Sequence, residues 1–420
     1  MTTKFLSLLL GLFWSASVFG QGALELDSCL AWAERNYPLV QQYQLLEKSK
    51  EYSLDNANKG YLPSIQIFGQ ATHQSEVTEI PFSLPNTSIE PLSQNQYRFY
   101  GELNQGLTDF LIIKDQKELI KTNTAIESQK IKVEMQQLKE RVNNMFFGIL
   151  LIEGQIEQLR LLQKDLQTGL EQNTLAIKNG VANNNSAWQL QVEQLKVEQQ
   201  LTELQAQRES LSKMLSLFIG QEVSRFSSLA KPQTPIFSLE ILRPELELFS
   251  LQLQALNAQD QLITAKNLPR FNLFFQGGAG RPGLNMLSND FSPYYIGGAR
   301  LTWNIGALYT LKKERKLIAL NQDGIGVQKD VFLFNTQMQL QESEQEILKS
   351  QKLMQSDAKI VQLQSDIAAS TQLQLAEGTV SSTEYILALN AKKKAQQNLL
   401  LHELQMLISQ YQHLTKSGKF

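Results

Sequence analysis

Few side chains in this sequence are placed for catalysis or for metal binding. The three histidines, His73, His402 and His413, are separated in the arrangement that the sequence predicts, and none has a carboxylate or cysteine at the spacing of a metal or nucleophilic site. Residues 277–280 (GGAG) look like a phosphate-binding loop, but Pro282 follows them instead of the start of a helix. The sequence therefore predicts no enzyme, no cofactor and no metal site.

The cysteine content and the charge limit other functions. Cys29 is the only cysteine, so the chain cannot form an internal disulfide, and the preceding Asp27-Ser28 is not the small-residue context of a lipoprotein signal. We expect Cys29 to be a buried helix residue. The chain has 39 Lys and Arg against 41 Asp and Glu, a net charge of −2. This balance argues against nucleic acid as a partner.

The first residues indicate export. Lys4 precedes an apolar run over residues 5–14 and small residues up to Gly20, which is the pattern of a secretory signal over residues 1–20. A membrane anchor is the alternative, but the run is short for a hydrocarbon layer of about 30 Å. No later apolar stretch has spanning length either, so any passage through a membrane is expected to use strands.

Two tandem copies of one unit organise the rest of the chain. Pro38 and Pro63 precede a first strand, and Pro244 and Pro269 precede its counterpart, at the common offset 244 − 38 = 269 − 63 = 206. After the strand loop the offset becomes 198, which relates Gly180 to Gly378. We expect a first repeat over residues 21–219, a linker with two prolines over residues 220–243, and a second repeat over residues 244–420.

Each copy contains a pair of alternating strands. Apolar and polar residues alternate over residues 65–71, 97–107, 271–276 and 295–305, which predicts strands with one apolar face. A sandwich core would explain this pattern, but strands of about ten residues with aromatic ends favour the wall of a membrane barrel. Arg98, Glu102 and Arg300 fall on the polar face and would line its lumen. Because four strands cannot enclose a useful bore, several chains must combine their strands.

Each copy also contains a long helical hairpin. Apolar residues recur every three or four positions over residues 109–178 and again over residues 190–218, with Asn179-Gly180 between them, and this predicts two antiparallel coiled helices. Residues 307–376 and 400–414 repeat the arrangement around Glu377-Gly378.

In the order and spacing of these features the chain resembles the TolC-like outer-membrane efflux proteins over almost all of its mature length. The resemblance rests on residues 26–33 (LDSCLAWA) leading to Asn36-Tyr37-Pro38, on the Leu-Pro pairs at Pro63 and Pro269, and on the glycine turns. It implies a mainly helical homotrimer with a transmembrane β part: trimeric α-barrel hairpins in the periplasm, and four strands per chain in a shared 12-stranded β-barrel.

The resemblance also implies partners and sites. The hairpin ends would dock a periplasmic adaptor protein and close the entrance; the residues concerned are Asn179, Gly180, Val181, Gly378, Thr379 and Val380. Glu384 falls at an acidic gate position, where three copies would form a negative ring, whereas its counterpart in the first copy is Ser186. The alternative is that Glu384 only caps the first turn of a helix.

These expectations combine into one function. The chain would be a passive exit duct in the cell outer membrane, in contact with its lipid, with a large periplasmic part and with energy supplied by an inner-membrane transporter. It would serve an efflux or type I secretion system, and its pump would select among drugs, metal ions or polypeptides. The alternatives are a periplasmic adaptor and a structural coiled-coil protein without a pore.

Overall fold

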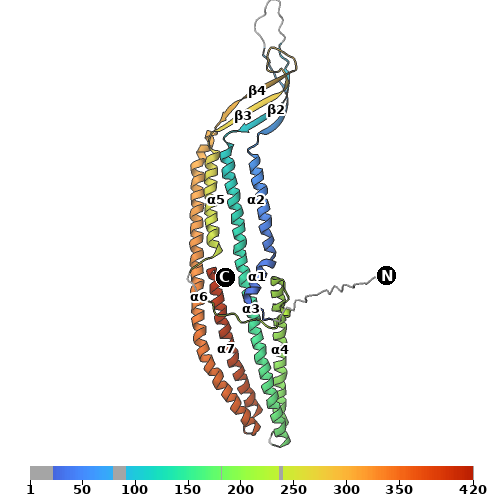
Figure 1. The fold of residues 1–420 in the computed structure, drawn as a ribbon, viewed down its shortest axis with the longest axis vertical. Coiled ribbons are helices and arrows are strands. Elements are labelled where there is room, and N and C mark those ends of the chain that lie inside the picture. The colour runs from blue at the N-terminus through green and yellow to red at the C-terminus, as the bar shows by residue number, and fades with distance from the viewer. Residues whose placement is uncertain (1–21, 79–90, 181, 236–239, 420) are drawn as a thin grey trace, which may run out of the picture. The chain divides into compact units, whose positions relative to one another are not determined.

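The structure, a computed structural model, describes residues 22–78, 91–180, 182–235 and 240–419. The first series of elements is α1 (Leu26–Asn36), η1 (Pro38–Val40), α2 (Gln41–Lys59), β1 (Ser64–His73), β2 (Asn95–Gly106), α3 (Asp109–Lys178) and α4 (Asn184–Ile219). The second series is η2 (Val223–Arg225), α5 (Pro244–Lys266), β3 (Arg270–Arg281), β4 (Ser292–Thr302), η3 (Ile305–Ala307), α6 (Leu308–Ala376) and α7 (Ser382–Ser417). Figure 1 shows these elements in chain order. The signal predicted over residues 1–20 lies outside the described residues.

Within the described ranges, no helix combines the length and the hydropathy that crossing a membrane would require.

The two series of elements share their lengths and their ends. Helices α4 and α7 each have 36 residues, and they begin 198 residues apart, since 382 − 184 = 198. Both end at a glycine in the left-handed region, Gly220 with φ 68° and Gly418 with φ 83°. The turns before these helices also contain left-handed glycines, Gly180 with φ 76° and Gly378 with φ 73°. The helices therefore keep the offset that the sequence predicted, while the repeat boundaries remain a prediction.

The chain packs as two compact units that cut across these series. Unit 1 comprises residues up to Tyr37, Met135–Ile241 and the chain from Gln337 onward, and unit 2 comprises Pro38–Glu134 and Leu242–Thr336. Helices α3 and α6 begin in unit 2 and end in unit 1.

Unit 2 contains one antiparallel sheet in the order β1-β2-β3-β4 (Figure 1). Its register places Gln66 opposite Glu102, and Glu102 opposite Gln276. Polar contacts join the helices of this unit: Lys117 Nζ of α3 donates to Asn58 Oδ1 of α2 at 2.7 Å, and Gln129 Nε2 donates to the Pro244 carbonyl at 2.8 Å.

Unit 1 contains two apolar clusters, to which α3 contributes residues mostly three or four positions apart. One cluster surrounds Phe146 and Phe147 and joins α1, α3, α4 and α7. The other surrounds Leu159 and Leu166 and joins α3, α4, α7 and the last turns of α6. Cys29 is fully buried in the first cluster, as predicted, and burial raises the pKa of its thiol to about 12.

The segment before α1 pairs with the linker between the copies. The Leu24 amide donates to the Ser228 carbonyl at 2.9 Å, and the Ala230 amide donates to the Leu24 carbonyl at 2.9 Å. Leu24 is 1% exposed, so this short pairing lies in the core of unit 1 and ties the linker to the start of the chain.

Alanine substitutions at Gly180 and Gly220 should separate the strain of a positive φ from a steric clash with a neighbouring side chain. At Gly180 a Cβ atom would meet nothing within 4 Å, so Gly180→Ala should cost only the strain of a positive φ, about 1 kcal/mol. At Gly220 a Cβ atom would lie 2.7 Å from Asn36 Oδ1, and Asn36 Nδ2 donates to the carbonyls of Leu217 and Phe218. Gly220→Ala should therefore lower the unfolding midpoint further than Gly180→Ala in parallel thermal melts. Equal midpoints would contradict the capping role of Asn36.

Candidate functional site

The turn of the second hairpin is held by backbone and side-chain bonds. The Gly378 amide donates to the Leu375 carbonyl at 3.1 Å, and both the amide and the hydroxyl of Thr379 donate to the Gln374 carbonyl. In the first hairpin, the Gly180 amide donates to the Ile177 carbonyl at 3.0 Å, and Val181 lies outside the described residues. Both glycines adopt the positive φ that closes a helix end.

Glu384 forms a capping box at the start of α7. The Ser381 amide donates to Glu384 Oε2 at 2.7 Å, and the Glu384 amide donates to Ser381 Oγ at 3.3 Å. The backbone N–H of Ser381 lowers the pKa of the Glu384 carboxyl below its ordinary value. In the first hairpin, Asn183 caps α4 by accepting from the Ser186 amide at 3.2 Å, so that hairpin has no charge at this point. The structure thus gives Glu384 a capping role, and its role as a gate remains a proposal.

Near these turns α7 packs against both helices of the first hairpin. Lys392 Nζ forms an ion pair with Asp165 Oδ2 of α3 at 2.9 Å, and the Tyr385 hydroxyl donates to the Asp165 carbonyl at 3.1 Å. Tyr385 is fully buried, and burial raises its pKa to about 12. A Cβ atom on Gly169 would lie 2.4 Å from the Tyr385 ring, so glycine is needed for this approach. Asn390 Nδ2 also donates to Glu193 Oε1 of α4 at 2.9 Å.

A groove of about 510 Å³ runs between α4 and α7 beside these contacts. Its apolar side chains are Trp188, Val192, Ile386 and Leu387; Trp188, Val192 and Leu387 are 58%, 51% and 64% exposed. Thr383 Oγ1 donates to Gln189 Oε1 at 3.0 Å across the groove. Exposed aromatic and aliphatic groups at the ends of a helical hairpin are typical of a protein contact surface. The sequence analysis missed this groove, although Trp188 stands only eight residues beyond Gly180.

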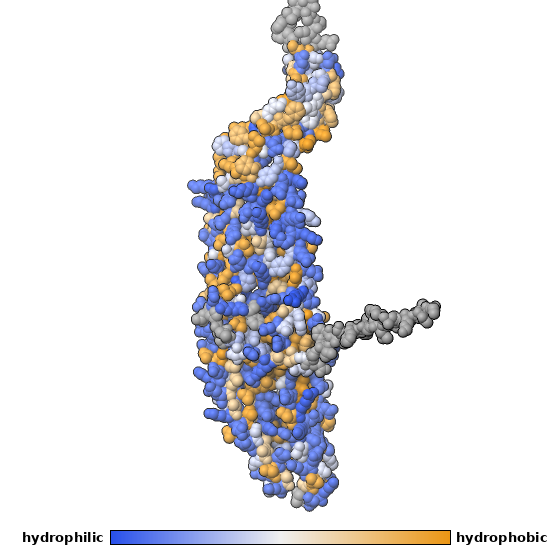
Figure 2. Space-filling view, in the orientation of Figure 1, coloured by the Kyte–Doolittle hydropathy of each residue, from blue (hydrophilic) through white to orange (hydrophobic). Residues whose placement is uncertain are grey.

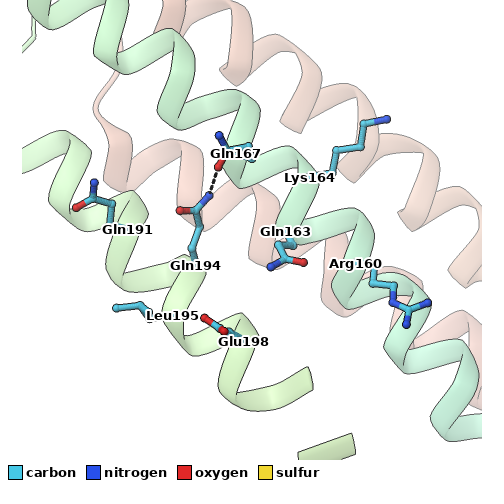
Figure 3. A pocket seen from close by; sticks show the side chains of 8 residues that line it. All are labelled: Arg160, Gln163, Lys164, Gln167, Gln191, Gln194, Leu195 and Glu198. Atoms are coloured by element: carbon cyan, nitrogen blue, oxygen red, sulfur yellow. Dashed lines mark hydrogen bonds between the residues drawn. The ribbon is translucent and has the colours of Figure 1, made fainter. Parts of the chain in front are cut away.

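A second groove, of about 660 Å³, lies between α3 and α4 (Figure 3). Figure 3 shows Gln194 of α4 pointing toward Gln167 of α3, and its Nε2 donates to Gln167 Oε1 at 2.9 Å. The remaining lining residues are Arg160, Gln163, Lys164, Gln191, Leu195 and Glu198. This lining is mostly polar amides and charged groups, so it can take hydrogen bonds from a partner but holds no arrangement suited to catalysis.

The three charged residues predicted for the lumen lie on one face of the sheet. Paired residues on neighbouring antiparallel strands point to the same face. Glu102 pairs with Gln276 of β3, and Arg300 pairs with Asn272 of β3. Asn272 and Gln276 are four residues apart, so they point to the same face as well. Arg98 shares this face because it lies four residues before Glu102 on β2. Gln276 Nε2 donates to Glu102 Oε2 at 2.7 Å, and the Arg300 guanidinium lies 4.7 Å from the Phe274 ring centroid. Their facing the lumen remains a proposal.

The same face also carries aromatic rings that the sequence analysis did not assign to a function. Phe68 pairs with Tyr100, and their stacked ring centroids are 5.0 Å apart. A Cβ atom on Gly278, opposite Tyr100, would lie 2.2 Å from the Phe99 carbonyl oxygen and 2.4 Å from the Tyr100 Cβ, so glycine is needed where β2 and β3 approach each other here.

The opposite face of the sheet is apolar and is the more exposed of the two. Ile65, Ile67 and Phe99 are 74%, 73% and 62% exposed, and Tyr295 and Leu301 are 74% and 61% exposed. On β2 and β3, exposed apolar positions alternate with half-buried positions, and the half-buried positions carry most of the polar side chains of these two strands. Figure 2 shows hydrophobic side chains gathered over the sheet and a mostly hydrophilic surface over the helices of unit 2. This polarity is the reverse of that of a water-soluble sheet.

The histidines have partners that sequence spacing did not reveal. His402 Nδ1 lies 2.5 Å from Asp357 Oδ2, and His413 Nδ1 lies 3.1 Å from Ser343 Oγ. The carboxylate belongs to another helix, 45 residues earlier in the chain. Among the described residues, no group of three His, Cys, Asp or Glu side chains could hold a metal ion.

A comparison of the sequence with protein-family models and with curated proteins finds no match. Among solved structures, the outer membrane protein VceC from Vibrio cholerae is similar, with a TM-score of 0.69 at 13% identity over 94% of this chain and 96% of VceC. CusC has a TM-score of 0.71 at 13% identity, over 94% of this chain and 92% of its own. The Neisseria gonorrhoeae outer membrane channel MtrE has a TM-score of 0.64 at 15% identity, over 93% and 88%. The likeness confirms the predicted TolC-like fold, a mainly helical chain with a four-stranded antiparallel sheet.

The capping box predicts how α7 responds to substitution and to pH. Ser381→Ala should lower the stability of unit 1 by about 1 kcal/mol, as loss of an N-cap usually does. Glu384→Gln keeps an acceptor for the Ser381 amide and should lower the stability of unit 1 less.

Because the pKa of Glu384 is lowered, the stabilisation from its carboxylate is fully present above the ordinary glutamate pKa and is lost as pH falls through the lowered value. Thermal melts at neutral and acidic pH, with Asn183→Ala as the matched control, check this. A larger loss for Glu384→Gln than for Ser381→Ala would contradict it.

Proposed function

We propose that this chain is the outer-membrane exit duct of a multi-component efflux or type I secretion system, and that it works as a passive homotrimeric channel. The observation that carries the proposal is the inverted polarity of the sheet. Each large apolar side chain that stays exposed to water lacks the roughly 1.5–3 kcal/mol of stabilisation that its burial would give. A surrounding of lipid acyl chains removes that cost, so the apolar face would contact outer-membrane lipid and the polar face would contact water in a lumen.

The sheet edges support assembly with other copies. Within the described residues β1 and β4 each pair on one side only, so each leaves a row of backbone groups unpaired. In a bilayer each unsatisfied group costs several kcal/mol, and a closed barrel removes the edges. Two chains would supply eight strands, which leave an interior filled by side chains, whereas three would supply twelve and enclose water.

Helix α6 supports the same assembly. In unit 2 it exposes apolar side chains at spacings of three, four and seven residues: Leu317, Leu320, Val327, Val331 and Phe334. Such a stripe is the seam of a coiled coil, and it needs a helical partner. A second copy of the chain supplies one.

The hairpin ends support docking of a periplasmic adaptor, through which an inner-membrane transporter would provide the energy. The α4–α7 groove offers exposed Trp188, Val192 and Leu387 beside Glu193 and Lys196, which suits an amphipathic helical hairpin. The turns at Asn179, Gly180, Gly378, Thr379 and Val380 would then extend this contact surface. Three copies of Glu384 would place negative charge at the entrance and favour cations there.

The proposal is tested by mass and conductance. The protein purified from outer membranes in detergent should have the mass of three chains, and in planar lipid bilayers it should form single channels. Glu384→Gln should weaken the preference for cations, because it removes three charges from the entrance and keeps the cap; Glu209→Gln, on the exposed side of α4, serves as the control.

A monomer without conductance would overturn the duct and favour an adaptor or a coiled-coil protein without a pore. A conducting trimer whose ion preference is unchanged by Glu384→Gln would overturn the gate alone.

A further inference from the structure

One register row on the polar face of the sheet is aromatic. The strand pairing places Phe68 of β1 opposite Tyr100 of β2, Tyr100 opposite Gly278 of β3, and Gly278 opposite Tyr294 of β4. Paired residues on neighbouring antiparallel strands point to the same face, so the row crosses all four strands. Tyr100 is two residues from Glu102 on β2, so this face is also that of Glu102. We call Phe68, Tyr100, Gly278 and Tyr294 the aromatic row.

The rings of the aromatic row stand on both sides of an open position. The Phe68 and Tyr100 rings are stacked, with their centroids 5.0 Å apart. Gly278 comes next and has no side chain, and within the described residues the Tyr294 ring beyond it contacts no other ring. Two steps of about 4.8 Å between strands separate the backbones of Tyr100 and Tyr294 by about 10 Å. One planar group fits between the two rings, because each stacked layer takes about 3.5 Å.

The charge next to the open position is negative. Glu102 lies in the adjacent register row between Gln66 and Gln276, and its Oε2 accepts from Gln276 Nε2 at 2.7 Å. Within the described residues Glu102 forms no ion pair. Arg98 lies beyond Tyr100, four residues or about 13 Å from Glu102 along an extended strand, which is too far for an ion pair. The Glu102 carboxylate is therefore available to a bound cation.

The same face holds a planar cation against a ring in the second copy. The Arg300 guanidinium lies 4.7 Å from the Phe274 ring centroid, an arrangement in which the ring attracts the cation. Phe274 is the counterpart of Phe68, since 274 − 68 = 206. Over Phe68 and Tyr100 no side chain of the described residues places a cation. The rings of the first copy are thus left for a cation that the chain itself does not supply.

We propose that the aromatic row and Glu102 form a binding site for planar aromatic cations, with the ring system of the ligand between Tyr100 and Tyr294 and its positive charge toward Glu102. The electron-rich faces of the two tyrosine rings attract a cation and disfavour an anion. Stacking against aromatic rings favours a flat ligand. The carboxylate adds to the preference for positive charge.

The strength of such a site suits a duct. If the chain assembles as proposed above, three of these sites line the lumen, and in that respect the inference rests on the proposed function. Conduction requires that a site bind a passing solute weakly enough to release it, and stacking and cation–ring contacts at accessible positions are weak. The site would therefore delay aromatic cations in transit. All of its residues belong to one chain, so its binding can be measured without a pore.

Dye binding to the full-length protein in detergent tests the site. Fluorescence polarisation of proflavine, a planar aromatic cation, should show saturable binding. Tyr294→Leu removes a ring and Glu102→Gln removes the charge while keeping an acceptor, so each should weaken binding about threefold to tenfold. Tyr294→Phe keeps the ring and should bind proflavine like the unaltered protein. The matched control is Tyr295→Leu on the opposite face of the same strand, which should leave the affinity unchanged.

Equal affinities of Tyr294→Leu and Tyr295→Leu for proflavine would overturn the site. Tighter binding of naphthalene-2-sulfonate, an aromatic anion, with loss of that binding in Arg98→Gln, would overturn the preference for cations.

Single-channel recordings test the position of the site in the duct. Proflavine added on the side of the sheet should block the current, and Tyr294→Leu should require about threefold to tenfold more dye for half block than Tyr295→Leu does. Identical block of these two variants would overturn the placement of the site in the lumen. A protein that does not conduct would overturn the duct, whereas the affinities measured in detergent would still decide whether the site exists.

Discussion

The hydrophobic effect sets the main constraint on this chain, because the four-stranded sheet exposes the apolar side chains of one face, while the polar side chains of β2 and β3 are mostly half-buried on the other. Ile65, Ile67 and Tyr295 are each more than 70% exposed, and Glu102 meanwhile bonds Gln276 on the opposite face. Within the described residues, the outer edges of β1 and β4 add unpaired backbone groups. Both features are costly in water and favourable in a closed wall between lipid and a water-filled lumen. These two features are what the proposed duct, a wall of several chains between lipid and water, would need.

The two hairpins share one geometry but differ in the residues that they bury. The hairpins share an offset of 198 residues, left-handed glycines at the same positions and 36-residue return helices. Their buried residues differ in part, since Met145, Ile152 and Leu159 of α3 correspond at this offset to Ser343, Ser350 and Asp357 of α6. Equal helix lengths keep this correspondence along both hairpins.

The long elements could be predicted from the sequence, because their periodicity extends over many turns. Helix α3 spans the residues 109–178 that the sequence predicted, with its end marked by Asn179-Gly180, and the alternation over residues 97–104 assigned Arg98 and Glu102 to one face. The capping box was also readable, since Ser381 and Glu384 have the spacing of that motif. These features depend on residues that are close in sequence.

The contacts between helices could not be predicted in the same way. Asp165 binds Lys392, 227 residues later, and Asp357 binds His402, so nothing local marks these side chains as partners. The α4–α7 groove likewise exists only once the two hairpins pack together.

Spin labels placed one at a time along β1, from Ser64 to His73, test the central claim most directly in the protein reconstituted into lipid vesicles. The labels report collisions with oxygen, which dissolves in lipid, and with a water-soluble nickel chelate. The account predicts alternation with a period of two, with Ile65 and Ile67 most accessible to oxygen and Gln66 and Gln70 most accessible to the chelate. Uniform access of the chelate to all positions, or no alternation, would contradict the sheet as a wall between lipid and lumen.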